Sequence, residues 1–178
     1  MVEDVKDILI SEEEIKKIVK KLGKEITEDY KNKNLILISV LKGSVVFMAD
    51  LMREIDLPLK IDFMIVSSYG DKTVSSGKVK IVKDLDIDLS DLDVLMVEDI
   101  LDTGRTLSSL IEILKTRKPK SLKLCTFLDK PDRRQTRIEA DYVGAQIPDE
   151  FVVGYGLDFD QKYRNLPYVG VLKPQIYE

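Results

Sequence analysis

The sequence predicts an α/β domain with a central, mostly parallel sheet flanked by helices. Apolar runs of strand length alternate along the chain with segments whose apolar residues recur at helical spacing. No repeat, low-complexity stretch or linker divides the 178 residues, a length that suits one domain with a sizeable core. Alternation of this kind indicates β-α-β units, whose ligands bind at the carboxyl ends of the strands.

The first third of the chain supplies two helices and the strand between them. Ser11 followed by Glu14 forms a capping-box pattern, which predicts a helix from there to about Tyr30. A continuous apolar run at 35–41 predicts a strand, and helical spacing resumes over 44–55. The apolar face of the first helix carries Ile15, Ile18, Val19, Leu22 and Ile26.

Strands dominate the rest of the chain. The polar stretch at 67–77 is predicted to be a mobile loop between two strands, and helical spacing predicts a helix at 106–115. The predicted strands lie at 61–66, 79–81, 93–97, 121–128, 142–147 and 151–155.

Composition excludes several classes of function. The 28 Lys and Arg residues against 32 Asp and Glu residues give a formal net charge of −4, and the pI near 5.1 argues against a dedicated nucleic-acid binder. The chain has no histidine, so Ser-His-Asp triads, Cys-His pairs and His-bound metals are excluded. Proton transfer must therefore fall to carboxylates, lysine or tyrosine.

The single cysteine and the amino-terminal residues indicate the compartment. Cys125 lies in the apolar run LKLCTFL and is interpreted as a small buried hydrophobic residue, unable to form an internal disulfide. The first residues, MVEDVKDILI, lack the basic and apolar regions of a signal peptide, and no apolar run approaches ~18 residues. We expect a cytoplasmic protein with no membrane partner.

The most informative segment is 94–107, VLMVEDILDTGRTL. An apolar strand runs into Glu98 and Asp99, which are expected not to be buried in the sheet because unpaired buried carboxylates are heavily penalised. Asp102 follows, and a Thr-Gly-x-Thr turn at 103–106 then places N–H groups and hydroxyls at a helix N-terminus, where a phosphate is favoured. A sugar phosphate satisfies both halves, because its hydroxyls can donate to the carboxylates while its phosphate lies on the turn.

Other interpretations of this segment compete with a sugar phosphate. Asp102 or Thr103 could simply cap the following helix, with the other acidic residues solvated. No G-x-x-x-x-G-K-[ST] loop occurs, and no G-x-G-x-x-G follows a strand, which argues against ATPases and dinucleotide-binding enzymes. Gly104 allows the backbone to approach a ligand closely, which favours the sugar phosphate.

An apolar strand that runs into E-D-x-x-D-T-G-x-T resembles the phosphoribosyl-pyrophosphate signature of type I phosphoribosyltransferases. Four more segments, 41–44, 68–69, 129–131 and 151–158, together with Arg164, extend the likeness over essentially the whole chain. They resemble the hypoxanthine-guanine phosphoribosyltransferase family in its compact bacterial form. The resemblance implies one domain over 1–178 with the type I fold, whose N- and C-terminal segments form a small hood.

The resemblance also implies a reaction and a cofactor. The family carries out purine salvage, the transfer of the 5-phosphoribosyl group from phosphoribosyl pyrophosphate to N9 of hypoxanthine or guanine, giving IMP or GMP and pyrophosphate. Glu98 and Asp99 would hold the ribose hydroxyls, with Mg²⁺ bridging ribose and pyrophosphate, and Asp158 would bind a second Mg²⁺. Asp102 would be the catalytic base that takes a proton from purine N7. The 5-phosphate would lie on Asp102, Thr103, Gly104, Arg105 and Thr106.

The remaining implied roles concern pyrophosphate and the base. Lys42, Gly43 and Arg164 would bind pyrophosphate, with a non-proline cis peptide bond before Lys42. Lys130 would recognise the 6-oxo group, because an ammonium only donates hydrogen bonds and adenine presents a 6-amino donor there. Phe151 would stack on the base, and the Val152 backbone would meet its edge. Each role has a plainer alternative. Lys130 could be an ordinary surface lysine, Phe151 and Val152 could be ordinary core residues, and Arg164 could form a salt bridge at the rim of the site.

The polar loop would act as a lid. In that role Ser68 and Tyr69 would close over the reacting centre and exclude water, and Tyr69→Ala would lower turnover and increase hydrolysis. The alternative is a simple connection with no gating role.

Other functions for the whole chain also compete. One is a phosphoribosyltransferase that prefers xanthine; another is a regulator that binds nucleotide or RNA without turnover. Family resemblance implies a homodimer or homotetramer.

Overall fold

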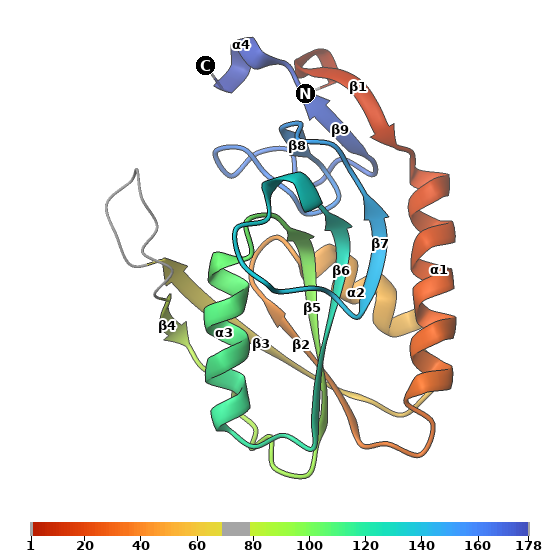
Figure 1. The fold of residues 1–178 in the computed structure, drawn as a ribbon. Helices are drawn as coiled ribbons and strands as arrows, with labels where there is room; N and C mark the ends of the chain where they lie inside the picture. The colour runs from red at the N-terminus through yellow and green to blue at the C-terminus, as the bar shows by residue number, and fades with distance from the viewer. Residues whose placement is uncertain (1, 69–78, 178) are drawn as a thin grey trace.

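The computed structural model describes residues 2–68 and 79–177, and its main sheet has six strands in the order β4-β3-β2-β5-β6-β7 (Figure 1). Tyr69 and most of the predicted lid lie outside the described residues. Every neighbouring pair of strands is parallel except β3 and β4. The predicted fold class is therefore confirmed. The strands are β2 (Leu35–Val40), β3 (Lys60–Ser68), β4 (Val79–Lys83), β5 (Asp93–Leu101), β6 (Ser121–Asp129) and β7 (Tyr142–Gln146).

Helices cover both faces of this sheet. In β2, Leu35 and Leu37 pack into the cluster that contains α1 and α2, whereas Ile36 and Ile38 pack into the cluster that contains α3. Successive side chains of a strand point to opposite faces, so a strand buried on both sides must be apolar throughout. The helices are α1 (Glu12–Asp29), α2 (Val45–Glu54), α3 (Arg105–Thr116) and the short C-terminal α4 (Pro174–Tyr177), with 3₁₀ turns η1 (Val2–Asp4) and η2 (Pro131–Arg133).

A small antiparallel sheet joins the two ends of the chain. Its order is β1-β9-β8, formed by β1 (Val5–Ile10), β9 (Val169–Leu172) and β8 (Val152–Val153). It lies beyond the carboxyl ends of β5 and β6, and its own apolar cluster contains Val153, Tyr163, Leu166 and Leu172 (Figure 1). The small sheet therefore overhangs the strand ends where the sequence places its acidic motif.

The local predictions agree with the structure except at several strands. The capping box is present, because Ser11 Oγ accepts from the Glu14 backbone at 3.3 Å and the Glu14 carboxylate accepts from the Ser11 backbone at 2.8 Å. Cys125 is fully buried, as expected. The strand predicted at 151–155 is reduced to two residues, and β1 and β9 were not predicted. Among the described residues, no helix is both long and apolar enough to span a bilayer.

Candidate active site

The acidic motif begins inside β5, which continues through Leu101, past its predicted end. Glu98 is only 8% exposed, and its Oε1 has no hydrogen-bond partner among the described residues. The expectation that Glu98 escapes burial in the sheet is therefore wrong. Burial, and then the neighbouring Asp99 charge, raise the pKa of Glu98 well above its usual value. The buried, unpaired oxygen is a strong acceptor without a donor, which a ligand hydroxyl or cation would satisfy.

Asp99 lies against the loop that follows β2. Burial raises the pKa of Asp99 to about 6, although the Ile100 backbone donates to its Oδ1 at 2.8 Å and the Arg164 charge acts in the opposite direction. A side-chain carbon on Gly43 would overlap Asp99 Oδ2, so the present position of this carboxylate depends on glycine at residue 43. The acidic strand end and the Lys42-Gly43 loop are thus in direct contact.

The helix after the motif begins at a glycine, which has no side chain to cap it. The N-cap of α3 is Gly104, in the left-handed region at φ 79°, and no side chain there accepts from the first turn. Thr103 Oγ1 accepts only a long contact of 3.4 Å from the Arg105 backbone. Thr103 therefore caps the helix only weakly, and Asp102 Oδ1 accepts no hydrogen bond from its first turn. The exposed donors of a helix N-terminus and its dipole favour an anion at this position.

A cavity of about 210 Å³ opens beside this turn. Glu98 lines it from β5, and Val40 and Val66 close it from the neighbouring strands. The motif contributes Asp102, Thr103, Gly104 and Thr106. A cavity lined both by carboxylates and by the N-terminal turn of a helix suits the hydroxyls and the phosphate of a sugar phosphate.

The second loop brings basic groups to the same place. The peptide bond between Leu41 and Lys42 is cis, as the resemblance implied. Lys42 Nζ donates to Gln161 Oε1 at 3.1 Å, which joins the Lys42-Gly43 loop to the segment after β8. Arg164 donates from Nη1 to the Gly156 carbonyl at 2.7 Å and pairs with Asp158 at 2.8 Å. The salt bridge of the plainer alternative exists, yet Arg164 Nε is buried without a partner among the described residues.

A cavity of about 410 Å³ lies on the other side of Asp102. Lys130 lines it and is 6% exposed, with its Nζ donating to the Glu150 carbonyl at 2.7 Å. Burial lowers the pKa of Lys130. The alternative of an ordinary surface lysine is therefore wrong. Phe151 and Val152 line the same cavity.

The two residues after Glu150 differ in exposure. Phe151 is 38% exposed, whereas Val152 is buried in β8. The Phe151 ring stacks on Tyr177 at 4.7 Å between centroids, with 19° between the planes, and it meets Phe159 edge-on. Tyr177 of α4 also lines this cavity, so the carboxyl-terminal segment contributes to its wall.

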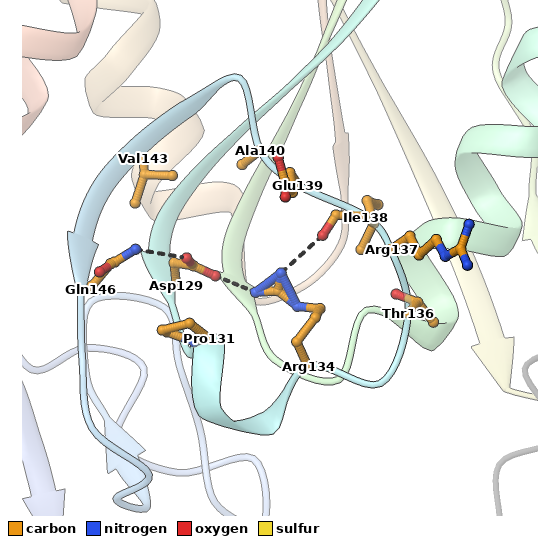
Figure 2. Close-up of a pocket in the computed structure, with 10 residues that line it drawn as sticks. All are labelled: Asp129, Pro131, Arg134, Thr136, Arg137, Ile138, Glu139, Ala140, Val143 and Gln146. Carbon is orange, nitrogen blue, oxygen red and sulfur yellow. Dashed lines mark hydrogen bonds and ion pairs between the residues drawn. The ribbon is translucent and has the colours of Figure 1, made fainter.

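The loop between β6 and β7 supports the strand end from the opposite side. It surrounds a cavity of about 580 Å³, in which Arg134 pairs with Asp129 and donates to the Ile138 carbonyl at 3.0 Å (Figure 2). The same guanidinium donates to the Asp102 carbonyl at 3.0 Å and the Leu101 carbonyl at 3.2 Å. Arg134 thereby fixes the backbone that carries Asp102.

The acidic residues fit a magnesium ion held jointly with substrate. Within 2–68 and 79–177, no group of three Cys, Asp or Glu residues could hold a metal ion by itself. The Asp158 carboxylate is engaged, because it forms an ion pair with Arg164 and accepts a hydrogen bond from the Gln161 backbone at 2.9 Å. In such sites Mg²⁺ keeps several waters and is bound by one or two carboxylates together with oxygens of the substrate. Glu98 and Asp99 can provide these carboxylates.

Sequence reasoning placed most of these residues but not all of them. Asp102 lines both the 210 Å³ and the 410 Å³ cavities, so the structure brings the acidic motif and the predicted base-binding residues together. Ser68 ends β3, and Tyr69 lies outside the described residues. Sequence reasoning missed Arg133 and Tyr177, both of which line the larger of these two cavities. The only signal for Arg133 was its position three residues after Lys130.

Comparison with known proteins identifies the class. Residues 5–160 match the family model described as phosphoribosyl transferase domain, and the chain belongs to this family. It is 57% identical to the hypoxanthine-guanine phosphoribosyltransferase of Bacillus subtilis over 100% of this chain and 99% of that one. The chain is therefore a member of the hypoxanthine-guanine phosphoribosyltransferases.

A solved structure and a longer relative support the same family assignment. A crystal structure of a hypoxanthine phosphoribosyltransferase from Staphylococcus aureus superposes with a TM-score of 0.98 at 54% identity, covering 100% of this chain and 97% of that one. The bifunctional protein TilS/HprT of Listeria monocytogenes is 55% identical over 98% of this chain. The present chain spans only 27% of the length of that relative.

Proposed function

We propose that the protein catalyses the magnesium-dependent transfer of the 5-phosphoribosyl group from phosphoribosyl pyrophosphate to N9 of hypoxanthine or guanine. The products are IMP or GMP and pyrophosphate, and the role is purine salvage. The observation that carries the proposal is the position of Asp102, which borders both the cavity beside the α3 N-terminus and the cavity that contains Lys130. A sugar phosphate in the first and a base in the second would meet at this residue.

The proposed roles at the sugar begin with the two acidic residues of β5. Glu98 and Asp99 accept hydrogen bonds from the ribose hydroxyls, and the backbone N–H groups at 103–106 bind the 5-phosphate. Mg²⁺ held at Glu98 and Asp99, and a second Mg²⁺ held at Asp158, would neutralise charge on the pyrophosphate group. Lys42, Gly43 and Arg164 bind pyrophosphate, and the Arg164 guanidinium offers it a planar fork of donors.

The proposed roles at the base select a 6-oxopurine. Lys130 donates to the 6-oxo oxygen, Phe151 stacks on the ring, and the Val152 backbone meets the edge of the base. As N9 forms its bond to the ribose carbon, the bond from that carbon to pyrophosphate breaks, and Asp102 takes the proton from N7. Adenine is disfavoured because its 6-amino group would face the donor of Lys130.

The proposal also covers the domain organisation, the cellular compartment and the oligomeric state. The chain forms one domain in which the small sheet is a hood over the site. The lid role of Ser68 and Tyr69 stays a prediction, because Tyr69 lies outside the described residues. The enzyme works in the cytoplasm as a homodimer or homotetramer. Its net charge of −4 supports a small-molecule substrate over a nucleic acid.

An absorbance assay with Mg²⁺ and phosphoribosyl pyrophosphate, offering hypoxanthine, guanine, xanthine and adenine separately, tests the base assignment. We expect turnover of hypoxanthine and guanine and none of adenine. Turnover of xanthine alone would leave the reaction standing and overturn the roles given to Lys130 and Val152. Lack of turnover with all four bases, together with RNA retention at moderate salt, would favour a regulator instead.

A further inference from the structure

Arg133 forms a bridge beside the proposed proton acceptor. Its Nε lies 2.9 Å from Asp102 Oδ1, and its Nη1 lies 3.2 Å from Asp149 Oδ1. All three residues line the cavity that also contains Lys130 and Phe151. Arg133 therefore joins the motif that follows β5 to the segment that precedes β8, at the wall of the proposed base site.

The bridge acts on one oxygen of Asp102. Oδ1 is buried, whereas the side chain as a whole is 39% exposed, so its exposed surface lies on its other atoms. Oδ1 accepts no hydrogen bond among the described residues, and the contact to Arg133 is an ion pair without hydrogen-bond geometry. Held in this way, the carboxylate keeps Oδ1 turned inward and leaves Oδ2 for a ligand.

The local fold explains why Arg133 reaches this position. The 3₁₀ turn η2 (Pro131–Arg133) follows Lys130 directly, and side chains three residues apart in such a turn lie on the same side. The facing segment secures both basic residues, because the Glu150 carbonyl accepts from Lys130 and the Asp149 carboxylate pairs with Arg133. A guanidinium can reach two carboxylates at once, which a lysine at this position could not do as well.

We propose that Arg133 is a positioning residue for Asp102, a role that rests on the proposed transfer reaction. Anchored by Asp149, its guanidinium sets the rotation of the Asp102 carboxylate so that Oδ2 faces N7 of the bound base. The backbone of Asp102 is fixed separately by Arg134, so Arg133 controls only the orientation of the side chain. The effect of Arg133 on turnover must then pass through the Asp102 carboxylate.

A double-mutant cycle tests this coupling. Arg133→Ala is expected to lower kcat with hypoxanthine about tenfold while the KM for phosphoribosyl pyrophosphate stays within about twofold. Arg133→Lys is expected to recover part of the loss. In the Asp102→Asn background, Arg133→Ala should lower kcat by no more than about twofold, because the group it positions has already been changed.

Arg137→Ala is the matched control. Arg137 belongs to the same loop and is exposed, its side chain points away from the Asp129–Arg134 pair (Figure 2), and it forms no ion pair with any described residue. The Arg137→Ala substitution removes the same positive charge as Arg133→Ala and should leave kcat within about twofold of the unsubstituted protein. Should Arg133→Ala fail to fold, Arg133→Lys and Asp149→Asn replace it in the cycle.

The possible outcomes separate the positioning role from the proposed reaction. Absence of turnover in the unsubstituted chain would overturn the proposed function itself. Normal turnover in that chain with unchanged kcat in Arg133→Ala would overturn only the positioning role. Equal losses from Arg133→Ala with and without Asp102 would show a structural effect that does not pass through the carboxylate, and would also overturn it.

Discussion

Replacing Asp99 with asparagine is predicted to stabilise the protein in the absence of ligands. Burial raises the pKa of Asp99 to about 6 from the ordinary value of 3.8, which means that its charged form is disfavoured in the folded state. At 1.36 kcal/mol for each pH unit, this difference corresponds to about 3 kcal/mol of destabilisation at pH 8. Asparagine keeps the shape and an oxygen for the Ile100 N–H but carries no charge.

The gain must depend on pH in a defined direction. An acid whose pKa is higher in the folded than in the unfolded state costs no stability below the unfolded value, and its cost develops as the pH rises through the folded value. The difference in unfolding free energy between Asp99→Asn and the unsubstituted protein should therefore be largest at pH 8. It should shrink as the pH falls from about 6 towards about 4.

Urea unfolding at pH 8 and pH 4.5, with EDTA present, measures this difference. EDTA is needed because an ion that binds only the folded protein would stabilise the unsubstituted chain by mass action. Asp132→Asn, which removes an exposed charge from the 3₁₀ turn η2, serves as the control and should change stability by less than about 0.5 kcal/mol. A less stable Asp99→Asn at pH 8, or a gain that does not change with pH, would refute the reasoning.

Three further substitutions test the site. Asp102→Asn should lower kcat at least about 100-fold in steady-state assays while the urea unfolding free energy stays within about 1 kcal/mol; retention of near-normal turnover would remove Asp102 as the base. Lys130→Gln, whose amide both donates and accepts, should narrow the preference for hypoxanthine over adenine by at least about tenfold in kcat/KM, and an unchanged ratio would contradict the role of Lys130. Gly104→Ala places a carbon 2.4 Å from Thr136 Oγ1 at a φ of +79° and should lower unfolding free energy by about 1–3 kcal/mol and raise the KM for phosphoribosyl pyrophosphate; normal values of both would argue against this turn as the phosphate site.

The sequence predicted the parts of the fold that local pattern specifies. The apolar run of β2 and the capping box of α1 each determine their own element, so both were found with only small errors at their ends. The small sheet could not be found in this way. Val5 of β1 pairs with Leu172 of β9, and no local pattern marks two short strands that stabilise each other across the length of the chain.

In the candidate site, too, the residues of a local motif were predicted, whereas contacts between distant segments were not. The motif at 98–106 was recognisable because its residues are contiguous and their chemistry is specific. The bridge from Arg133 to Asp102 and Asp149, and the stacking of Tyr177 on Phe151, depend on how distant segments pack. Burial of Glu98 was missed because β5 continues past the end of its apolar run and carries the acidic residue into the sheet.

The most direct test of the central claim is to identify and count the products. The protein is incubated with hypoxanthine, phosphoribosyl pyrophosphate and Mg²⁺, and nucleotide and pyrophosphate are quantified by chromatography. The account predicts that IMP and pyrophosphate appear in equal amounts, and that EDTA abolishes both. Pyrophosphate released without IMP, or no product at all, would contradict it.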